Sequence, residues 1–266
     1  MKGRWNALAA SALGMAAVLL PVGASSGAAV MHGGAAIYVP HGLVPQGLSQ
    51  FHDSTNWSGY AETGAKGSYT SVGGSWTVPK ASATSGRSTY SSAWIGIDGA
   101  TNSSLIQTGT DTEYVNGKAH YDAWWEILPA DAKVIPSLTI SPGDSMTGLI
   151  TKGSPSWTIT ITDNTTKKSF TILKAYTGPA TSIDWIVERP EVNGSQSSLA
   201  RYGSVTFTGA TVNGANAALK TADEYYMFRN SSNTTIISIP GAPNAAGNSF
   251  TVAHGAVAPP APASSH

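Results

Sequence analysis

Short runs of β-branched and aromatic residues recur along most of this chain, separated by clusters of glycine, asparagine, aspartate, serine and proline. Runs bounded by such turn residues are typical of β-strands, as in "SSAWIGID", "YDAWWEIL" and "SVTFTGATVNG". Helical periodicity is nearly absent, and only "GANAALKTADEYYMF" is open to either a strand or a short helix. Because many strands in one open sheet would leave an apolar face in water, the pattern predicts an all-β fold, a β-sandwich of two antiparallel sheets.

The two ends of the chain depart from the strand pattern. Residues 1–28 join Lys2 and Arg4 to the apolar run "ALAASALGMAAVLL" and a small-residue region, which is typical of a secretory signal peptide. A membrane anchor is the weaker alternative, because this run of about 14 residues is shorter than the ~20 that span a bilayer. We expect a propeptide or linker over residues 29–52, one folded domain over 53–254 and a Pro/Ala-rich tail over 255–266. The sequence thus predicts a secreted, extracellular protein.

Composition excludes several classes of function. The 15 basic and 15 acidic residues give a formal net charge of zero, with no basic run to follow a nucleic-acid backbone. The absence of cysteine excludes a disulfide framework, a thiol nucleophile and a thiolate metal site. We expect no nucleic-acid partner, no membrane partner after signal cleavage, and a monomeric protein.

Four of the expected strands can be divided by face, because successive side chains on a strand point to opposite sides. In "AWIGID", Ile95 and Ile97 share one face, while Trp94 and Asp98 share the other. In the remaining three strands the corresponding polar or mixed positions are Gln107 with Asp111, Trp124 with Glu126, and Asp184 with Glu188. A tryptophan left in water forfeits a few kcal/mol of burial energy, so tryptophans beside carboxylates suggest a groove. Ordinary half-exposed sandwich strands remain the alternative.

The sequence offers little support for a catalytic or metal-binding histidine. Four of the six histidines lie in the terminal segments and His254 is the last residue of the expected domain, which leaves His120 alone in its interior. No G-x-S-x-G motif accompanies it for a Ser-His-Asp triad, and no two histidines have the spacing of zinc ligands. We therefore expect no metal and no cofactor, and we interpret His120 as a surface residue.

Carboxylates remain as the acid–base groups, although the Asp-Thr/Ser-Gly signature of pepsin-like aspartic peptidases is absent. Glycosidases use two carboxyl groups about 5–9.5 Å apart. Asp184 and Glu188, four residues apart on one strand, would be separated by about 13 Å. A cross-strand pair such as Glu126 and Glu188 leaves a sandwich-fold glycosidase open, and a lectin-like binding module is a further alternative.

Several motifs occur together in one order: "NWSGY", "SWTVP", "AWIGIDG", "LIQTGTD", "YDAWWEILP", Gly143-Asp144 and "DWIVERP". In that order, from about Asn56 to Phe207, the chain resembles the glutamic peptidases, also called eqolisins or peptidase family G1. The resemblance implies a secreted endopeptidase active in acid, with a catalytic domain over 53–254. It also implies a β-sandwich of the concanavalin A-like or jelly-roll type, with a groove for protein or peptide substrates across one sheet. Fungal members carry disulfides, so this cysteine-free chain looks like a bacterial member.

The resemblance assigns roles to particular residues. The catalytic glutamine of the family falls on Gln107, and the catalytic glutamate on Glu188, the second acid of the motif whose first acid is Asp184 here. Groove tryptophans would correspond to Trp57, Trp94 and Trp124, and supporting acids to Asp98, Asp111 and Glu126. For Asp98, which precedes a glycine, hydrogen bonding within a turn is an equal alternative.

The same resemblance implies a mechanism. Glu188 would act as general base and then general acid, while the Gln107 amide would stabilise the oxyanion. Glutamine stays neutral at every pH, and the reference pKa of glutamate, about 4.3, predicts activity in acid.

The segment to His52 would either cover the groove until its histidines are protonated or form an unstructured leader.

Overall fold

The computed structural model describes residues 30–31, 52–82 and 86–264. The expected signal peptide and nearly all of the expected propeptide lie outside the described residues. Within them almost every regular element is a strand, and the exception is one turn of 3₁₀-helix, η1 (Thr221–Asp223). The ambiguous window "GANAALKTADEYYMF" contains both alternatives, because η1 leads directly into strand β18 (Glu224–Asn230).

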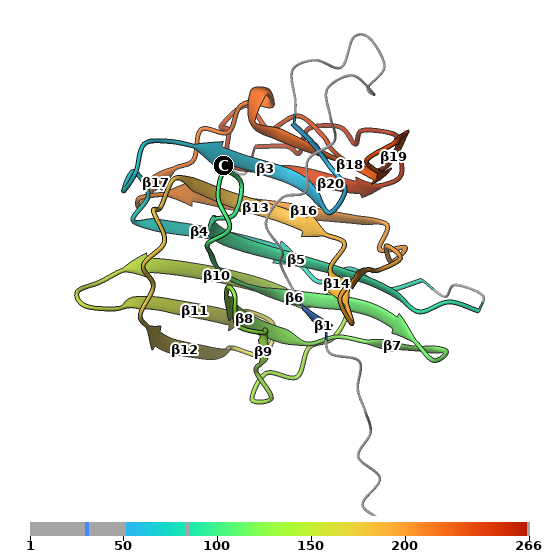
Figure 1. Cartoon of the computed structure of the whole chain (residues 1–266), viewed down its shortest axis with the longest axis horizontal. Helices are drawn as coiled ribbons and strands as arrows, with labels where there is room; N and C mark the ends of the chain where they lie inside the picture. Colours follow the sequence, from blue (N-terminus) through green and yellow to red (C-terminus); the bar gives the residue numbers. More distant parts are fainter. Residues whose placement is uncertain (1–29, 32–51, 83–85, 265–266) are drawn as a thin grey trace, which may run out of the picture.

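Two layers of strands make up the domain (Figure 1). The first sheet has the order β9-β8-β6-β5-β13-β3-β18, and every neighbouring pair in it is antiparallel. Its strands are β9 (Lys133–Val134), β8 (Ala123–Ile127), β6 (Leu105–Val115), β5 (Thr89–Asp98), β13 (Ser182–Glu188), β3 (Trp57–Thr63) and β18.

The second sheet has the order β20-β16-β4-β10-β11-β12, again antiparallel throughout. Its strands are β20 (Phe250–His254), β16 (Ser204–Val212), β4 (Ser71–Thr77), β10 (Ser145–Lys152), β11 (Trp157–Asp163) and β12 (Lys168–Lys174). Strand β19 (Asn233–Pro240) pairs with β18 on one side and with β20 on the other. The hydrogen-bonded ladder therefore continues from one layer into the other.

Short strands complete the edges. They are β7 (Lys118–His120), β17 (Ala215–Asn216), β2 (His52–Ser54), β1 (Val30–Met31), β14 (Glu191–Val192) and β15 (Ser195–Gln196). The order β1-β14-β15 forms a separate small sheet. Strand β2 pairs in parallel with β18, which is a departure from the antiparallel pattern expected from the sequence.

The central core lies between the two sheets. Inward-facing residues such as Ile95 and Ile183 from the first sheet meet Met146 and Phe207 from the second. Burying each such side chain stabilises the fold by about 1.5–3 kcal/mol.

Two tryptophan side chains donate hydrogen bonds across this core. Trp76 Nε1 donates to Thr110 Oγ1 at 2.8 Å, and Trp185 Nε1 donates to the main-chain O of Gly73 at 2.9 Å. These bonds satisfy buried donors and fix how the sheets stack.

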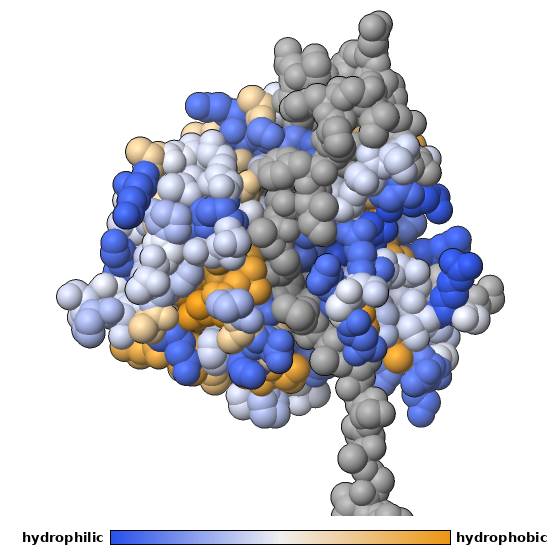
Figure 2. Space-filling model, viewed as in Figure 1, coloured by the Kyte–Doolittle hydropathy of each residue, from blue (hydrophilic) through white to orange (hydrophobic). Residues whose placement is uncertain are grey.

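The visible surface is mostly hydrophilic, with an apolar area toward its lower left (Figure 2). His120 is exposed at the end of β7, as the sequence predicted. No helix among the described residues is long and apolar enough to cross a membrane.

Candidate active site

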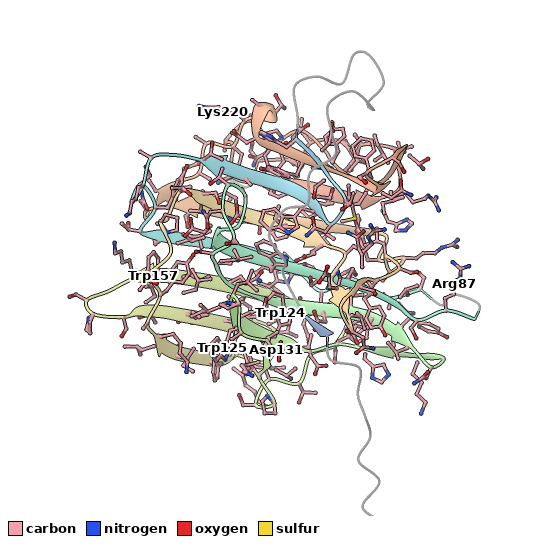
Figure 3. The ribbon with its side chains drawn as sticks, viewed as in Figure 1. Arg87, Trp124, Trp125, Asp131, Trp157 and Lys220 are labelled. Carbon is pink, nitrogen blue, oxygen red and sulfur yellow. The ribbon has the colours of Figure 1, made fainter. Side chains whose placement is uncertain are left out.

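The first sheet has a second cluster of large side chains on the face turned away from the central core, called here the outer face. Ile95 and Ile97 pack in the central core, whereas Trp94, between them on β5, packs in this second cluster. Trp124 and Trp125, which follow each other on β8 and are labelled in Figure 3, divide in the same way between the two clusters. The division of faces expected from the sequence is therefore confirmed. The remaining buried members of the cluster are Trp57, Ala61, Ala100, Leu105, Ile186 and Tyr225.

Glu188 ends β13 on the outer face, and only 1% of its surface is exposed. Trp94 Nε1 donates to Glu188 Oε2 at 2.9 Å. Asn56 Nδ2 donates to Glu188 Oε1 at 3.3 Å. Each carboxyl oxygen thus accepts a hydrogen bond from a different part of the sheet, which fixes the orientation of the group.

Asn56 is a hydrogen-bond partner of Glu188 that the sequence did not point to. Its Oδ1 accepts a 2.8 Å hydrogen bond from Ser54 Oγ, and its main-chain O accepts one of 2.8 Å from Arg189 N. Asn56 therefore holds both Glu188 and the residue that follows it. The signal available in the sequence was "NWSGY", but the contact joins residues 132 positions apart, which spacing does not reveal.

Gln107 and Glu126 face each other across β6 and β8. Gln107 Nε2 donates to Glu126 Oε2 at 2.7 Å, and both side chains are fully buried. Burial and the nearby charges of Glu188 and Asp111 raise the pKa of Glu126 to about 9, against the opposing effect of the Gln107 hydrogen bond. Glu126 is accordingly protonated and neutral in acid.

Asp111 also lies on this face. It is paired with Ser92, which is in turn paired with Glu188, so Asp111 stands in line with Glu188 two strands away. The structure therefore brings Gln107, Asp111 and Glu188 close enough to Glu126 to affect its pKa.

Asp98, the third expected supporting acid, lies at the far end of β5 with different partners. It has a φ of 73°, a left-handed conformation that aspartate adopts more readily than most residues. Its carboxylate accepts hydrogen bonds from Tyr176 Oη at 2.6 Å and from the main-chain N atoms of Ala180 and Thr181 at 2.8 Å each. These bonds anchor the 176–181 loop rather than Gln107, in agreement with the turn alternative.

Asp184, the first acid of the β13 motif, is fully buried and is paired in the sheet with Gly96, which is paired with Gln107. Burial and the neighbouring Asp98 charge hold the pKa of Asp184 well above its usual range. Asp184 is therefore a second carboxyl group that stays neutral in acid.

The three expected groove tryptophans are Trp57, Trp94 and Trp124, and all three are fully buried in the outer-face cluster. Trp57 and Trp94 meet edge to face, with ring centroids 5.0 Å apart. A Cβ at Gly109 would lie 2.5 Å from Trp94 Cβ and 3.0 Å from Trp124 Cζ2. Only glycine at this position leaves room for the two indoles beside Gln107's strand.

No group of three or more histidine, cysteine, aspartate or glutamate side chains that could hold a metal ion occurs in the described part of the chain. The chemistry that this geometry offers is that of a carboxyl group and an amide. The Glu188 carboxyl and the Gln107 amide lie beside two further carboxyl groups, those of Glu126 and Asp184, which stay uncharged in acid.

Comparison with known proteins assigns the family. The profile of the Peptidase A4 family matches residues 55–251, which is most of the chain. The chain belongs to the peptidase A4 family. Among relatives of this peptidase, aspergillopepsin-2 of Aspergillus niger is 35% identical over 200 residues, covering 65% of this chain and 70% of that protein. Scytalidopepsin B of Scytalidium lignicola is 31% identical over 202 residues, covering 70% of this chain and 75% of that protein.

Solved structures agree. The crystal structure of scytalido-glutamic peptidase with a transition state analog inhibitor superposes with a TM-score of 0.63 at 25% identity, covering 75% of this chain and 98% of that one. Aspergilloglutamic peptidase from Aspergillus niger gives a TM-score of 0.52 at 31% identity, covering 62% and 99%. This peptidase A4 protein is thus a glutamic endopeptidase with the all-β sandwich expected from its sequence. The expected bacterial origin stays a prediction.

Proposed function

We propose that Glu188 and Gln107 form the catalytic dyad of this acid peptidase. The observation that carries the proposal is the outer-face arrangement. Glu188 is a buried carboxyl group oriented by Trp94 and Asn56, and the Gln107 amide is oriented by Glu126. A base and an amide donor are held by separate partners, as catalysis by preorganised groups requires.

In the proposed reaction, Glu188 takes a proton from water as the water oxygen bonds to the carbonyl carbon of the peptide. The carbonyl π electrons move to oxygen, and Gln107 donates an amide N–H to that oxyanion. A side-chain amide has two N–H groups, and we assign the oxyanion to the one that is not bonded to Glu126. The C–N bond then breaks as Glu188 returns the proton to the leaving nitrogen, which yields a carboxylic acid and an amine.

Glu126 supports this cycle by remaining uncharged. Its pKa of about 9 keeps it protonated throughout the acid range, so no second anion stands beside Glu188 or the developing oxyanion. Asp111 and Asp98 are assigned to positions further out, Asp111 in line with Glu188 and Asp98 at the 176–181 loop.

We further assign protein or peptide substrates to the outer face. Structures of related peptidases contain a peptide-based transition state analog and the tripeptide Ala-Ile-His. An extended peptide could use main-chain hydrogen bonds and side-chain pockets there, with Trp57, Trp94 and Trp124 as its apolar surroundings. The hydrogen bond of Glu126 to Gln107 makes the glycosidase pairing of Glu126 with Glu188 the weaker assignment.

We propose in addition that the protein is secreted after removal of residues 1–28, acts as a monomer, and carries a removable propeptide over 29–52. In support of a propeptide near the site, β1 pairs with β14, whose first residue, Glu191, is three positions after Glu188.

The dyad is tested with Glu188→Gln and Gln107→Ala, assayed on denatured casein from pH 2 to 7. Each is expected to lower kcat by about a thousandfold or more without a change in melting temperature beyond a few degrees. Glu191→Gln is the matched control, since it removes a carboxylate nearby and should leave activity within twofold. Substantial turnover by either dyad variant, or release of sugar from β-glucan by the wild type, would contradict the assignment.

A further inference from the structure

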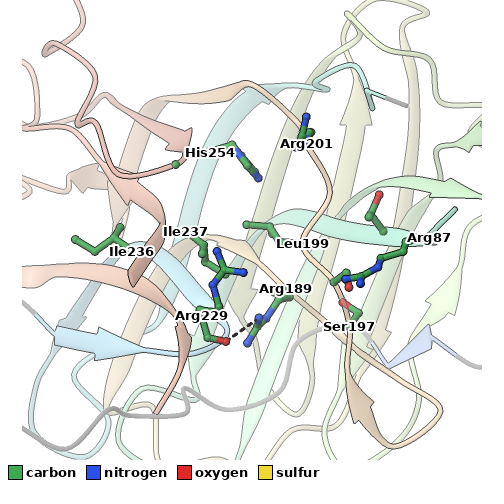
Figure 4. A pocket seen from close by; sticks show the side chains of 12 residues that line it. Arg87, Arg189, Ser197, Leu199, Arg201, Arg229, Ile236, Ile237 and His254 are labelled. Carbon is green, nitrogen blue, oxygen red and sulfur yellow. Dashed lines mark hydrogen bonds between the residues drawn. The ribbon is translucent and has the colours of Figure 1, made fainter. Parts of the chain in front are cut away.

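Four arginines from distant parts of the sequence line one cavity of about 800 Å³ at the Glu188 end of β13. They are Arg87, Arg189, Arg201 and Arg229 (Figure 4). The chain has only five arginines, and the remaining one is Arg4. No lysine and no acidic residue is among the described residues that line the cavity, whereas the chain as a whole balances its charges. The arginine pocket, as we call it, is therefore a concentrated positive site.

The electrostatics within the pocket show the same excess of positive charge. Burial and the neighbouring Arg229 lower the pKa of Arg189 to about 10. Burial and Arg201 lower the pKa of His254, which also lines the pocket. In both cases a neighbouring cation makes the protonated form less favourable.

Arg189 is built into the pocket rather than spread over the surface. Its side chain is only 7% exposed, and its Nη1 donates to the main-chain O of Arg229 at 3.1 Å. Its Nε has no hydrogen-bond partner among the described residues, and the buried Oγ of Ser197 at the pocket wall has none there either. A buried guanidinium N–H without an acceptor is costly, so the pocket is short of an oxygen ligand.

We infer that the arginine pocket binds a tetrahedral oxyanion, a phosphate or sulfate group. Arginine presents paired N–H groups that match the oxygens of such an anion, and the exclusive use of arginine over lysine favours this geometry. An acid peptidase works where carboxylates, with reference pKa values near 4, lose part of their charge. Phosphate and sulfate groups stay anionic there. The volume exceeds that of a bare ion, which favours a phosphate or sulfate ester on a larger molecule.

The test is calorimetric titration of the purified protein with inorganic phosphate and with sulfate at pH 4.5, with ionic strength held constant by chloride. We expect saturable one-to-one binding and a rise in melting temperature. The double variant Arg201→Gln/Arg229→Gln, which changes two exposed side chains, should weaken binding about tenfold or more. The matched control Lys66→Gln/Lys168→Gln removes the same charge from two exposed positions, one in a turn and one at the start of β12, and should change affinity less than twofold.

Three results would overturn the inference: no saturable binding, equal weakening in both double variants, or succinate binding as tightly as phosphate. The source of the anion is separated with a phosphoserine peptide and its unphosphorylated form, both titrated into Glu188→Gln to prevent cleavage. Tighter binding of the phosphopeptide than of inorganic phosphate identifies an ester ligand, and no gain identifies the free ion. The titrations with inorganic phosphate and sulfate need no peptidase activity, so failure of the dyad proposal would leave them intact.

Discussion

Trp94 donates its indole N–H to Oε2 of Glu188 from the neighbouring strand β5, over 2.9 Å. The sequence suggested a groove wall for this tryptophan, and the structure adds that its side chain is buried and is a hydrogen-bond partner of the proposed base. A second indole, that of Trp76, makes a bond of similar length to Thr110 inside the central core. Trp94 and Trp76 can therefore be compared, because one hydrogen bond lies at the proposed site and the other is remote from it.

Replacing Trp94 with phenylalanine should therefore affect catalysis more than stability. The loss of one hydrogen bond to a carboxyl group should lower kcat about tenfold, with KM changed less than threefold and stability reduced by about 1–3 kcal/mol. Trp76→Phe, the matched control, should lose comparable stability and keep wild-type kcat. Equal kcat for the two variants, measured with thermal unfolding in parallel, would show that the Trp94 contact is merely structural.

The protein should be more stable in acid than at neutral pH. The pKa of Glu126 is raised to about 9, above the value of about 4.3 in an unfolded chain. Between these values the folded state keeps a proton that the unfolded state has lost, so this stability is complete below about pH 4 and declines as pH rises toward 9. Asp184 has a pKa shifted in the same direction. We expect the melting temperature to fall by at least about 5 °C from pH 4 to pH 7.

Glu126→Gln tests the origin of that slope. Glutamine imitates the protonated acid and keeps an oxygen to accept the Gln107 hydrogen bond, so the variant should match the wild type near pH 4. At pH 7 it should melt at a higher temperature than the wild type. Superimposable profiles for the two proteins would locate the effect in other carboxyl groups.

Activity should be confined to acid and should survive inhibitors of other peptidase classes. The reasoning is that the chain contains no Asp-Thr/Ser-Gly motif, and the described residues contain no metal-holding cluster. Pepstatin, serine-directed reagents and chelators should each leave at least about 90% of activity, in the assay used for the dyad. Complete inhibition by a chelator that added zinc reverses would rule out the proposed mechanism.

Residues 29–52 should restrain the peptidase until acid is reached. Protonation of His32, His41 and His52 in acid would add positive charge, which would loosen a segment placed over the outer face. N-terminal sequencing after incubation at pH 7 and then pH 4 should show loss of the segment together with the appearance of activity. A chain that stays unprocessed yet is fully active immediately after acidification would favour the unstructured-leader alternative.

Strand faces could be predicted from the sequence because a strand has a strict period of two. Ile95 and Ile97 enter the central core and Trp94 the outer-face cluster, as the alternation in "AWIGID" requires. The "TDNTTKK" turn likewise connects β11 and β12 as an antiparallel hairpin, because both partners are close in sequence.

Contacts between distant segments could not be predicted in this way. Asn56 reaches Glu188 only because β3 and β13 are neighbours in the sheet, and the order of strands is not written in local periodicity. The bonds of Asp98 to Ala180 and Thr181 depend on a loop more than 80 positions away, as the separations of 82 and 83 residues show. The arginine pocket was missed for the same reason, since its four arginines are isolated in the sequence.

The strand order of the first sheet has a consequence for how the peptidase is synthesised. β13 lies between β3 and β5, and the other edge of β3 pairs with β18, which ends at Asn230. The sheet that carries Gln107 and Glu188 therefore cannot close until almost the whole chain has emerged from the ribosome. Pairings of such long sequence separation also fold slowly. A growing chain consequently has no assembled peptidase with which to attack itself or its neighbours, so its latency during synthesis follows from strand order alone.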